Sequence, residues 1–306
     1  MKNLIVVLMG GISGEREISF LTGKACSNAL KKKGFSIIQL DAKGNFVEKL
    51  KKLNPKIVFN ALHGRYGEDG FVQTILEELR IPYTHSGVFA SSLAMDKELS
   101  RIIFNKNNLK TPKYLVLYKN IKKNINNEIR KKKITFPIVI KPVNEGSSLG
   151  VYICKNKNQF IINYKKLIKD YEKIIVEEYI PGKEIQVAVM GNKALGAIEL
   201  IPKRKFYDYK AKYSSKAKTK HIMPASISPY KYAEVLNIAK KAHKILGCRG
   251  ITRSDFRFNK NKFYLLETNT QPGMTKLSLV PEIAEHCGIK FEDLVEWMVK
   301  DASNNR

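Results

Sequence analysis

The sequence predicts an α/β protein that begins with a parallel sheet, and two features of its first part support this fold class. The run LIVVLM at residues 4–9 is apolar throughout, which is typical of a strand buried on both faces. Further short apolar runs then alternate with helix-like patterns, as they do in parallel α/β layers. In such a layer, ligands bind beyond the carboxyl ends of the strands. A chain of 306 residues is long enough for two or three domains with separate cores.

Polar residues follow the first strands of this layer. After the first strand comes a glycine-rich turn and a helical pattern, with Ser13 placed to cap the helix and Glu15 near its positive end. His63 follows the strand predicted at 57–61. Both Glu15 and His63 fall where ligands would bind, although a carboxylate at a helix start and a histidine in a turn explain them equally well. The turn does not match G-x-G-x-x-G, so a dinucleotide site is not predicted.

The middle of the chain continues with strands and helices in alternation. We predict helices at 71–79 and 90–105, strands at 35–40, 114–117, 136–141 and 151–154, and a basic helix or loop at 121–133. Lys97 lies within the second of these helices, where a lysine is usually exposed to solvent. The first domain is expected to span residues 1–93, the second 94–183 and the third 184–306.

A lysine ends the strand at 136–141, and a loop rich in glycine and serine follows it. In such a loop the backbone N–H groups and the hydroxyls of Ser147 and Ser148 can surround an anion, with Lys141 adding a positive charge. An ordinary hairpin loop with a solvated lysine fits the same residues. Further along, Glu177 and Glu178 close a strand predicted at 174–179. Two more strands are predicted, at 185–190 and 194–201.

The segment 206–213 (FYDYKAKY) is aromatic and basic without clear periodicity, and a polar stretch continues it to Lys220. A long irregular segment inside a domain is uncommon unless it is functional or disordered, and the aromatic residues argue against disorder. Helices at 230–246 and 291–301 complete the predicted elements.

Two short strands late in the chain carry three oxygen-bearing side chains. Asp255 lies in the strand at 253–258, whereas Glu267 and Asn269 follow the strand at 263–266, with a hairpin turn between the two. Pairing of these strands would bring Asp255 beside Glu267, and Asn269 would share a face with Glu267. Two carboxylates and an amide oxygen suit Mg²⁺ that also contacts phosphates. A polar strand end with solvated acids is the alternative.

The composition limits the classes of function. The net charge is +27, from 55 basic and 28 acidic residues, and most of the basic residues are lysine. A nucleic-acid-binding protein is therefore an alternative, but such proteins more often use arginine with interleaved aromatic residues, so no nucleic acid is expected as a partner. The four cysteines form no C-x-x-C pair, which favours a reducing compartment. No apolar stretch is long enough for a signal peptide or a membrane span, so we expect a cytoplasmic protein without membrane contact.

Taken in order, these motifs resemble the ATP-grasp superfamily and, within it, the bacterial D-alanine–D-alanine ligases. The resemblance rests on five segments, namely GGISGEREIS, ALHGRYGEDG, KPVNEGSSLG, FYDYKAKY and ETNTQPGMTKLS. They occur in the order of the family, and the similarity extends over residues 4–294. The resemblance implies a three-domain ATP-grasp architecture, with α+β organisation in the second and third domains.

The resemblance also implies a role for each matching residue. The residues that match ATP-binding positions are Lys97, Lys141, Ser147, Ser148, Glu177, Glu178, Ile180, Glu184 and Lys212. The residues that match the ligands of two Mg²⁺ ions are Asp255, Glu267 and Asn269. Glu15 matches the residue that anchors the ammonium group of the first D-alanine. Ser278 and Leu279 match contacts to the carboxylate of the second D-alanine, and His63 matches a residue near the substrates. Arg253 and the Gly273 N–H match stabilisers of an oxyanion, and Tyr213 matches a residue that bridges to Ser147 and Glu15.

The implied reaction joins two D-alanine molecules through a D-alanyl phosphate, with ATP converted to ADP, for peptidoglycan precursor synthesis. ATP is a substrate and two Mg²⁺ ions are cofactors, for which Mn²⁺ can substitute; a requirement for K⁺ is left open. Relatives that use D-lactate generally carry histidine at the position of Tyr213, so the tyrosine favours the dipeptide. D-lactate or D-serine as the second substrate is the alternative. The family is commonly dimeric, which implies a homodimer.

Overall fold

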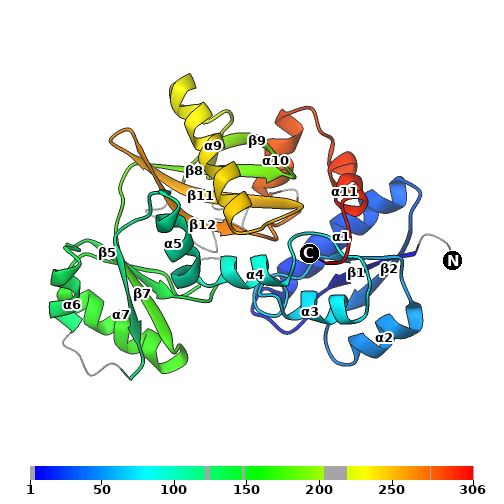
Figure 1. Cartoon of the computed structure of the whole chain (residues 1–306), viewed down its shortest axis with the longest axis horizontal. Coiled ribbons are helices and arrows are strands. Elements are labelled where there is room, and N and C mark those ends of the chain that lie inside the picture. Colours follow the sequence, from blue (N-terminus) through cyan, green and yellow to red (C-terminus); the bar gives the residue numbers. More distant parts are fainter. Residues whose placement is uncertain (1–3, 121–124, 147–148, 203–218, 276, 306) are drawn as a thin grey trace.

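The computed structural model describes residues 4–120, 125–146, 149–202, 219–275 and 277–305. Within these ranges the strands form three separate sheets of three, four and five strands. Figure 1 shows the three-stranded and four-stranded sheets at opposite ends of the molecule, with the five-stranded sheet above and between them. The α/β class predicted from the sequence is confirmed.

The first sheet is parallel, with strand order β2-β1-β3. Its strands are β1 (Leu4–Met9), β2 (Ser36–Asp41) and β3 (Ile57–Asn60). All six residues of β1 are buried, as the uninterrupted apolar run predicts. Helices of this part are α1 (Arg16–Lys32), α2 (Phe46–Leu53) and α3 (Phe71–Glu78). Ser13 does not cap the helix, because α1 begins at Arg16 and Glu15 occupies the N-cap position. Ser13 Oγ instead accepts the Glu15 N–H and donates to the carbonyl of His63.

The second sheet is antiparallel, with strand order β4-β7-β5-β6. Its strands are β4 (Tyr114–Tyr118), β5 (Ile138–Pro142), β6 (Tyr152–Cys154) and β7 (Lys173–Glu178). Two helices, α6 (Ile125–Lys131) and α7 (Lys157–Asp170), cover this sheet, and their apolar residues form a core with it alone. This core includes Phe160 and Leu167 of α7, a helix that the sequence reasoning did not predict.

The third sheet is antiparallel, with strand order β10-β9-β8-β11-β12. Its strands are β8 (Lys183–Met190), β9 (Lys193–Ile201), β10 (Lys220–Ile222), β11 (Ile251–Asn259) and β12 (Lys262–Asn269). Neighbouring residues of β9 enter different cores, because successive strand side chains point to opposite faces. Ala197 packs with α9 (Pro229–Ile245), and Ile198 packs with α10 (Leu279–His286) and α11 (Phe291–Lys300).

One core joins the first and third sheets. Ile5 and Val7 of β1 lie in the same cluster as Ile198 of β9 and Val295 of α11. Helix α11 also packs along α1, where Lys32 and Glu292 form an ion pair of 2.9 Å. The first and third sheets therefore share apolar contacts that the second sheet lacks. The domain boundaries near residues 93 and 183 stay predictions.

The helix predicted at 90–105 is in fact two helices, α4 (Val88–Met95) and α5 (Lys97–Lys106). Asp96 separates them because its backbone is extended, and its carboxylate accepts the N–H groups of Glu98 and Leu99. This is an N-cap, which ends one helical run and starts another in a new direction. The break places Lys97 in the first turn of α5, where it is buried rather than exposed.

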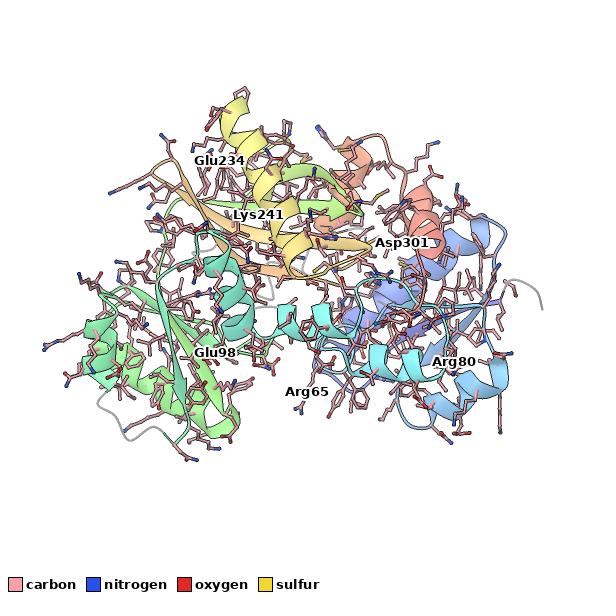
Figure 2. All side chains as sticks on the ribbon, in the orientation of Figure 1. Arg65, Arg80, Glu98, Glu234, Lys241 and Asp301 are labelled. Carbon is pink, nitrogen blue, oxygen red and sulfur yellow. The ribbon has the colours of Figure 1, made fainter. Side chains whose placement is uncertain are left out.

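The excess of basic residues is spread over the outside of the molecule. Figure 2 shows charged side chains projecting from each of the three sheets and the helices around them, including Lys241 on α9 and Arg65 in the loop before α3. No helix among the described residues is long and apolar enough to cross a membrane.

Candidate active site

Two adjoining cavities lie where the three sheets approach one another. The larger, of about 380 Å³, is lined by residues of the second and third sheets, including Lys141, Glu177 and Asp255. The smaller, of about 60 Å³, is lined by Glu15 and His63 of the first part and by residues that follow β12. Both cavities share the side chains of Lys97, Glu145 and Glu267 in their walls. The larger falls in the size range of nucleotide and cofactor pockets.

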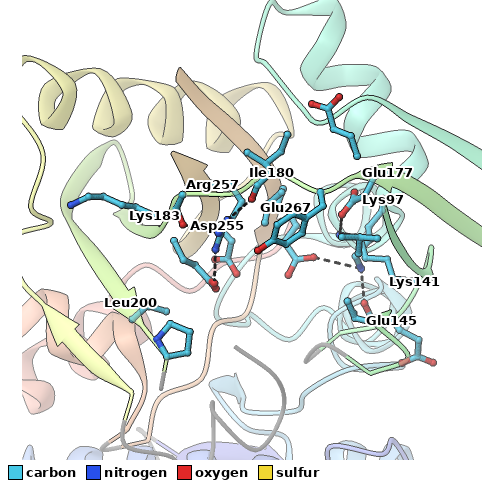
Figure 3. Close-up of a pocket in the computed structure, with 18 of the residues that line it drawn as sticks. Lys97, Lys141, Glu145, Glu177, Ile180, Lys183, Leu200, Asp255, Arg257 and Glu267 are labelled. Atoms are coloured by element: carbon cyan, nitrogen blue, oxygen red, sulfur yellow. Dashed lines mark hydrogen bonds and ion pairs between the residues drawn. The ribbon is translucent and has the colours of Figure 1, made fainter. Parts of the chain in front are cut away.

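Lys97 lies on the shared wall, and its ammonium group meets groups from two other elements (Figure 3). It donates to the carbonyl of Glu145 at 2.5 Å and lies 3.6 Å from the Glu267 carboxylate. Burial lowers the pKa of Lys97; Glu267 opposes this shift, while Lys141 and Arg101 add to it. An anion brought into this wall would favour the charged form of Lys97 and would bind more tightly because of it.

Glu177 of β7 holds two cations in the wall of the larger cavity. One carboxylate oxygen lies 3.0 Å from the ammonium of Lys141, and the other forms an ion pair with Arg101. Burial opposes ionisation of Glu177, but Arg101 and Lys141 outweigh it and keep its pKa below the usual range. Both carboxylate oxygens of Glu177 are therefore occupied by the two cations. Lys141 is fixed at the end of β5 with its charge facing the cavity.

The turn between β7 and β8 forms another side of the larger cavity, and Glu178, Ile180 and Glu184 all line it. Arg257 of β11 fastens this turn, because its guanidinium donates to the Ile180 carbonyl at 3.0 Å and to the Glu184 carboxylate at 3.2 Å. The first contact ties the turn after β7 to the third sheet, whereas the second lies within the third sheet, because Glu184 belongs to β8. A planar base or a sugar hydroxyl entering here meets a mixed apolar and polar edge.

The predicted hairpin is formed by β11 and β12, and Asp255 pairs with Glu267 in the register of the two strands. Arg253 binds both oxygens of Asp255, at 2.7 and 3.0 Å. Asn269 lies opposite Arg253, and its side-chain oxygen accepts the Gln271 N–H at 2.7 Å.

Hard oxygen donors on two adjacent strands, beside a cavity that is also lined by Lys97 and Lys141, fit a magnesium ion in chemical type. The set has two carboxylates and one amide. No group of three or more His, Cys, Asp or Glu side chains in the described ranges is placed to hold a metal ion. The predicted set can therefore hold an ion only if other oxygens, such as those of phosphates, complete its coordination.

The smaller cavity is lined on one side by buried groups of the first part of the chain. Glu15 stands at the start of α1, and its carboxylate lies close to Gly146, since a Cβ added there would be 2.9 Å from Glu15 Oε1. His63 is buried, with one ring nitrogen 2.8 Å from Thr22 Oγ1 and the other 3.1 Å from Glu68. A carboxylate and a histidine at this wall suit a small ligand with an ammonium group.

The opposite side of the smaller cavity comes from the third sheet and the loop after β12, including Arg253, Asn269 and Gly273. Ser278 precedes α10 and its hydroxyl oxygen accepts the Thr275 N–H at 2.9 Å, so it closes this loop. Leu279 begins α10, and its side chain is part of the core. Any ligand contact of Leu279 therefore comes from its backbone.

Four predicted site residues, Ser147, Ser148, Lys212 and Tyr213, lie outside the described residues. The structure brings the other predicted residues to the two cavities or, for Ser278 and Leu279, to the loop that borders the smaller one.

The sequence reasoning did not identify four residues that shape the site: Arg101, Glu145, Glu68 and Arg257. One signal for Arg101 is present, because it follows Lys97 by four residues and therefore shares a helix face with it. Arg257 follows Asp255 by two residues in a strand and so shares its face. Glu68 and Glu145 lie in irregular loops, where no periodicity indicates the direction of a side chain.

Comparisons with known proteins show which proteins the chain is similar to. A family model described as "D-ala D-ala ligase C-terminus" matches residues 103–300. The chain is 56% identical to a D-alanine–D-alanine ligase of Pelagibacter ubique (strain HTCC1062), with 100% of both chains covered. It is 47% identical to one of Wolbachia pipientis wMel, covering 99% of this chain and 95% of that protein.

Solved structures show the same similarity. A D-alanine–D-alanine ligase from Bacillus anthracis complexed with ATP matches with a TM-score of 0.86 and 29% identity, over 98% of this chain and 97% of that one. Another structure of the B. anthracis ligase matches with a TM-score of 0.88 and 32% identity, with the same coverage.

Proposed function

The chain belongs to the D-alanine–D-alanine ligase family, and from this premise we propose that it joins two D-alanine molecules into D-alanyl-D-alanine with ATP as the energy source. The product serves peptidoglycan precursor synthesis. The observation that best supports this function is the pair of unequal cavities with a common wall at Lys97, Glu145 and Glu267. The larger has room for a nucleotide and the smaller for an amino acid.

The first step converts a poor acyl donor into a good one. We place ATP in the larger cavity and the first D-alanine in the smaller one, with its ammonium group at Glu15. A carboxylate oxygen of D-alanine then attacks the terminal phosphorus of ATP, and the bond from that phosphorus to the ADP oxygen breaks. Lys97 and Lys141 counter the charge on the phosphates, and positioning supplies much of the remaining rate enhancement. Asp255, Glu267 and Asn269 are proposed to hold magnesium, which when bound neutralises and orients phosphate oxygens.

The second step forms the peptide bond. The amine of the second D-alanine attacks the carbonyl carbon of the acyl phosphate, the C–N bond forms, and the C–O bond to phosphate breaks with loss of a proton from the amine. Arg253 and the Gly273 N–H line the smaller cavity and are proposed to stabilise the negative oxygen. One such donor contributes about 3 kcal/mol in other enzymes. His63 and Glu68 are proposed to orient the first substrate.

Several finer features are proposals that rest on the family. Ser147, Ser148, Lys212 and Tyr213 are proposed to cover the site and exclude water, because the acyl phosphate would otherwise hydrolyse. Glu178, Ile180 and Glu184 are proposed to contact the nucleoside. Ser278 and Leu279 are proposed to bind the second carboxylate. Two magnesium ions, a homodimer and a cytoplasmic location complete the proposal.

A direct assay tests the proposed reaction. The purified chain, incubated with ATP, magnesium and D-alanine, is expected to release ADP, phosphate and D-alanyl-D-alanine in equal amounts. Glu267→Gln is expected to lower the turnover about a hundredfold or more, because one carboxylate of the proposed metal site is lost. Glu285→Gln, on the exposed side of α10, is the matched control and should retain wild-type turnover. Absence of dipeptide would refute the function, and near-normal turnover of Glu267→Gln would refute the metal assignment.

Competition between acceptors tests the choice of second substrate. D-alanine, D-serine and D-lactate are supplied together at neutral pH, and the products are separated by mass. The dipeptide is expected to dominate. A preference for D-lactate would assign the chain to the depsipeptide-forming members of the superfamily.

A further inference from the structure

The smaller cavity is closed by two loops that come from distant parts of the chain. The loop after β3 carries His63, whereas Asn269 ends β12 and the loop after it carries Gly273. The proposed reaction requires the groups on these loops to act on one small molecule together. Whatever fixes the distance between the loops therefore fixes the geometry of the reaction.

Gln271 crosses between the two loops. Its side chain is 2% exposed, although an amide is among the more polar groups a protein can bury. Its Nε2 donates to the carbonyl of Leu62, the residue before His63, and its Oε1 accepts from Asn60 Nδ2 at 2.9 Å. Both polar ends of Gln271 are thus satisfied by the end of β3 and the loop that follows it, more than two hundred residues earlier in the sequence.

The contacts of Gln271 with Asn60 and Leu62 form a bridge between the two segments, and Asn60 anchors its far end. It is 0% exposed, and its Oδ1 accepts the Leu62 N–H at 3.2 Å while its Nδ2 also donates to the carbonyl of Gly67 at 3.1 Å. Leu62 and Gly67 bracket the turn that carries His63, and Gly67 precedes Glu68. The bridge therefore ends on the same short turn from which the two side chains project into the smaller cavity.

The near end of the bridge is equally close to the reacting groups. The Gln271 N–H donates to Asn269 Oδ1 at 2.7 Å, and Gly273 follows two residues later. A backbone shift at Gln271 would therefore move both Asn269 and Gly273. Gln271 itself does not line either cavity, so it has no direct contact with a substrate held there.

We propose that Gln271 is a positioning residue. Its buried side chain sets the spacing between the turn that carries His63 (residues 60–68) and the loop that carries Gly273 (residues 270–275), and so aligns the two D-alanine sites. This inference rests on the proposed ligase function for its effect on catalysis. Its structural part, the coupling of the two loops, is independent of the substrate. Small displacements of positioned groups are enough to matter, because a misplacement of about 1 Å can lower a rate a hundredfold.

Gln271→Met is the variant that tests the inference, since it keeps the length and volume of the side chain and removes both hydrogen bonds. Gln73→Met is the matched control. Gln73 is also a buried glutamine, 1% exposed, and its Nε2 donates to the Gly67 carbonyl at 2.8 Å, but its hydrogen bond stays within the first part of the chain. Both substitutions remove an amide from the same buried network, and only one of them cuts the bridge.

The kinetic expectation separates positioning from general damage. Gln271→Met should raise KM for D-alanine or lower kcat by about tenfold or more, while KM for ATP stays within about twofold of the wild type. Gln73→Met should leave KM for D-alanine, kcat and KM for ATP within about twofold of the wild type. Equal kinetic effects of the two substitutions, or a rise in KM for ATP as large as the effect on D-alanine, would overturn the inference.

Amide hydrogen exchange supplies a readout that does not depend on activity. In Gln271→Met, exchange should become faster in both loops, at residues 60–68 and 270–275. In Gln73→Met, it should change only at residues 60–68. If the wild type makes no dipeptide, the proposed function fails. The exchange result would still show whether Gln271 couples the two loops. Faster exchange of Gln271→Met in one loop only would overturn the coupling even in an active ligase.

Discussion

At the scale of single residues, the ion pairs of Glu177 explain how two cations can be buried side by side. Arg101 is fully buried, and its guanidinium lies over the ring of Tyr114 at 5.2 Å. Its Nε and Nη1 have no hydrogen-bond partner among the described residues. One glutamate thus faces two cations, Arg101 and Lys141, so this cluster of three side chains carries an excess of positive charge. Such a cluster is costly without a ligand and favourable with a polyanion.

Arg101→Met tests this interpretation. With one cation removed, Glu177 neutralises Lys141 alone, so KM for ATP should rise about tenfold while KM for D-alanine changes little. Stability should fall by about 3 kcal/mol, because a buried carboxylate loses a partner. Steady-state kinetics and chemical denaturation measure the two effects. Arg101→Lys should recover part of both, and Arg80→Met, at an exposed arginine, should change neither. An unchanged KM for ATP in Arg101→Met would contradict the proposed role of the charge.

At the scale of helices and strands, much of the fold could be predicted because burial leaves a pattern in the sequence. Strand β1 follows from an uninterrupted apolar run, and the hairpin of β11 and β12 follows from two strand-like runs with a turn between them. The register pairs Asp255 with Glu267 as expected. The break at Asp96 was missed because an aspartate within a helical pattern does not reveal whether it caps a new helix. The role of Gln271 could not be predicted, since its partners Asn60 and Leu62 are distant in the sequence and only the folded chain brings them together.

Helix α9 provides a test of acid stability at this scale. His243 is buried on α9 and its Nδ1 lies 2.8 Å from Thr252 Oγ1 of β11. Burial lowers the pKa of His243 to about 4. The unfolded chain therefore binds a proton at this residue before the folded one does, and the stability present above pH 6.5 is lost as the pH falls toward 4.

The expected loss from His243 between pH 7 and pH 5 is about 2 kcal/mol, because one pKa unit corresponds to about 1.4 kcal/mol. His243→Gln should reduce the loss by this amount, as measured by urea denaturation at both pH values. His286→Gln, at an exposed histidine in the last turn of α10, should leave the pH dependence unchanged. Identical pH dependences of His243→Gln and wild type would rule out a neutral buried histidine as the cause.

At the scale of the whole molecule, one hydrophobic core joins two of the three sheets, and the remaining sheet has a core of its own. The first and third sheets share a core through β1, β9, α10 and α11, whereas the second sheet has a core with α6 and α7 only. The larger cavity lies between the second and third sheets, so its two sides belong to different cores. The second sheet should therefore open or shift with less loss of apolar contact than any other part.

Leu167→Ala tests this division. Leu167 of α7 is 3% exposed and belongs to the core of the second sheet. Its truncation should cost about 2–5 kcal/mol of local stability and speed amide exchange in β5 and β7, while β8 and β11 stay protected. Leu294→Ala, in the core that the first and third sheets share, should instead speed exchange in β1 and β9 together. Equal loss of protection in all three sheets after Leu167→Ala would show that the molecule unfolds as one unit.

The wall of Lys97, Glu145 and Glu267 between the two cavities has a pharmacological consequence. Because the two cavities border the same three side chains, a single compound with a purine-like head and an amino-acid-like tail should be able to reach both at once. Its second end would bind at high effective concentration once the first is seated, so a short linker should add affinity without any new contact. Inhibitors assembled from two weak fragments are therefore a rational route against this chain.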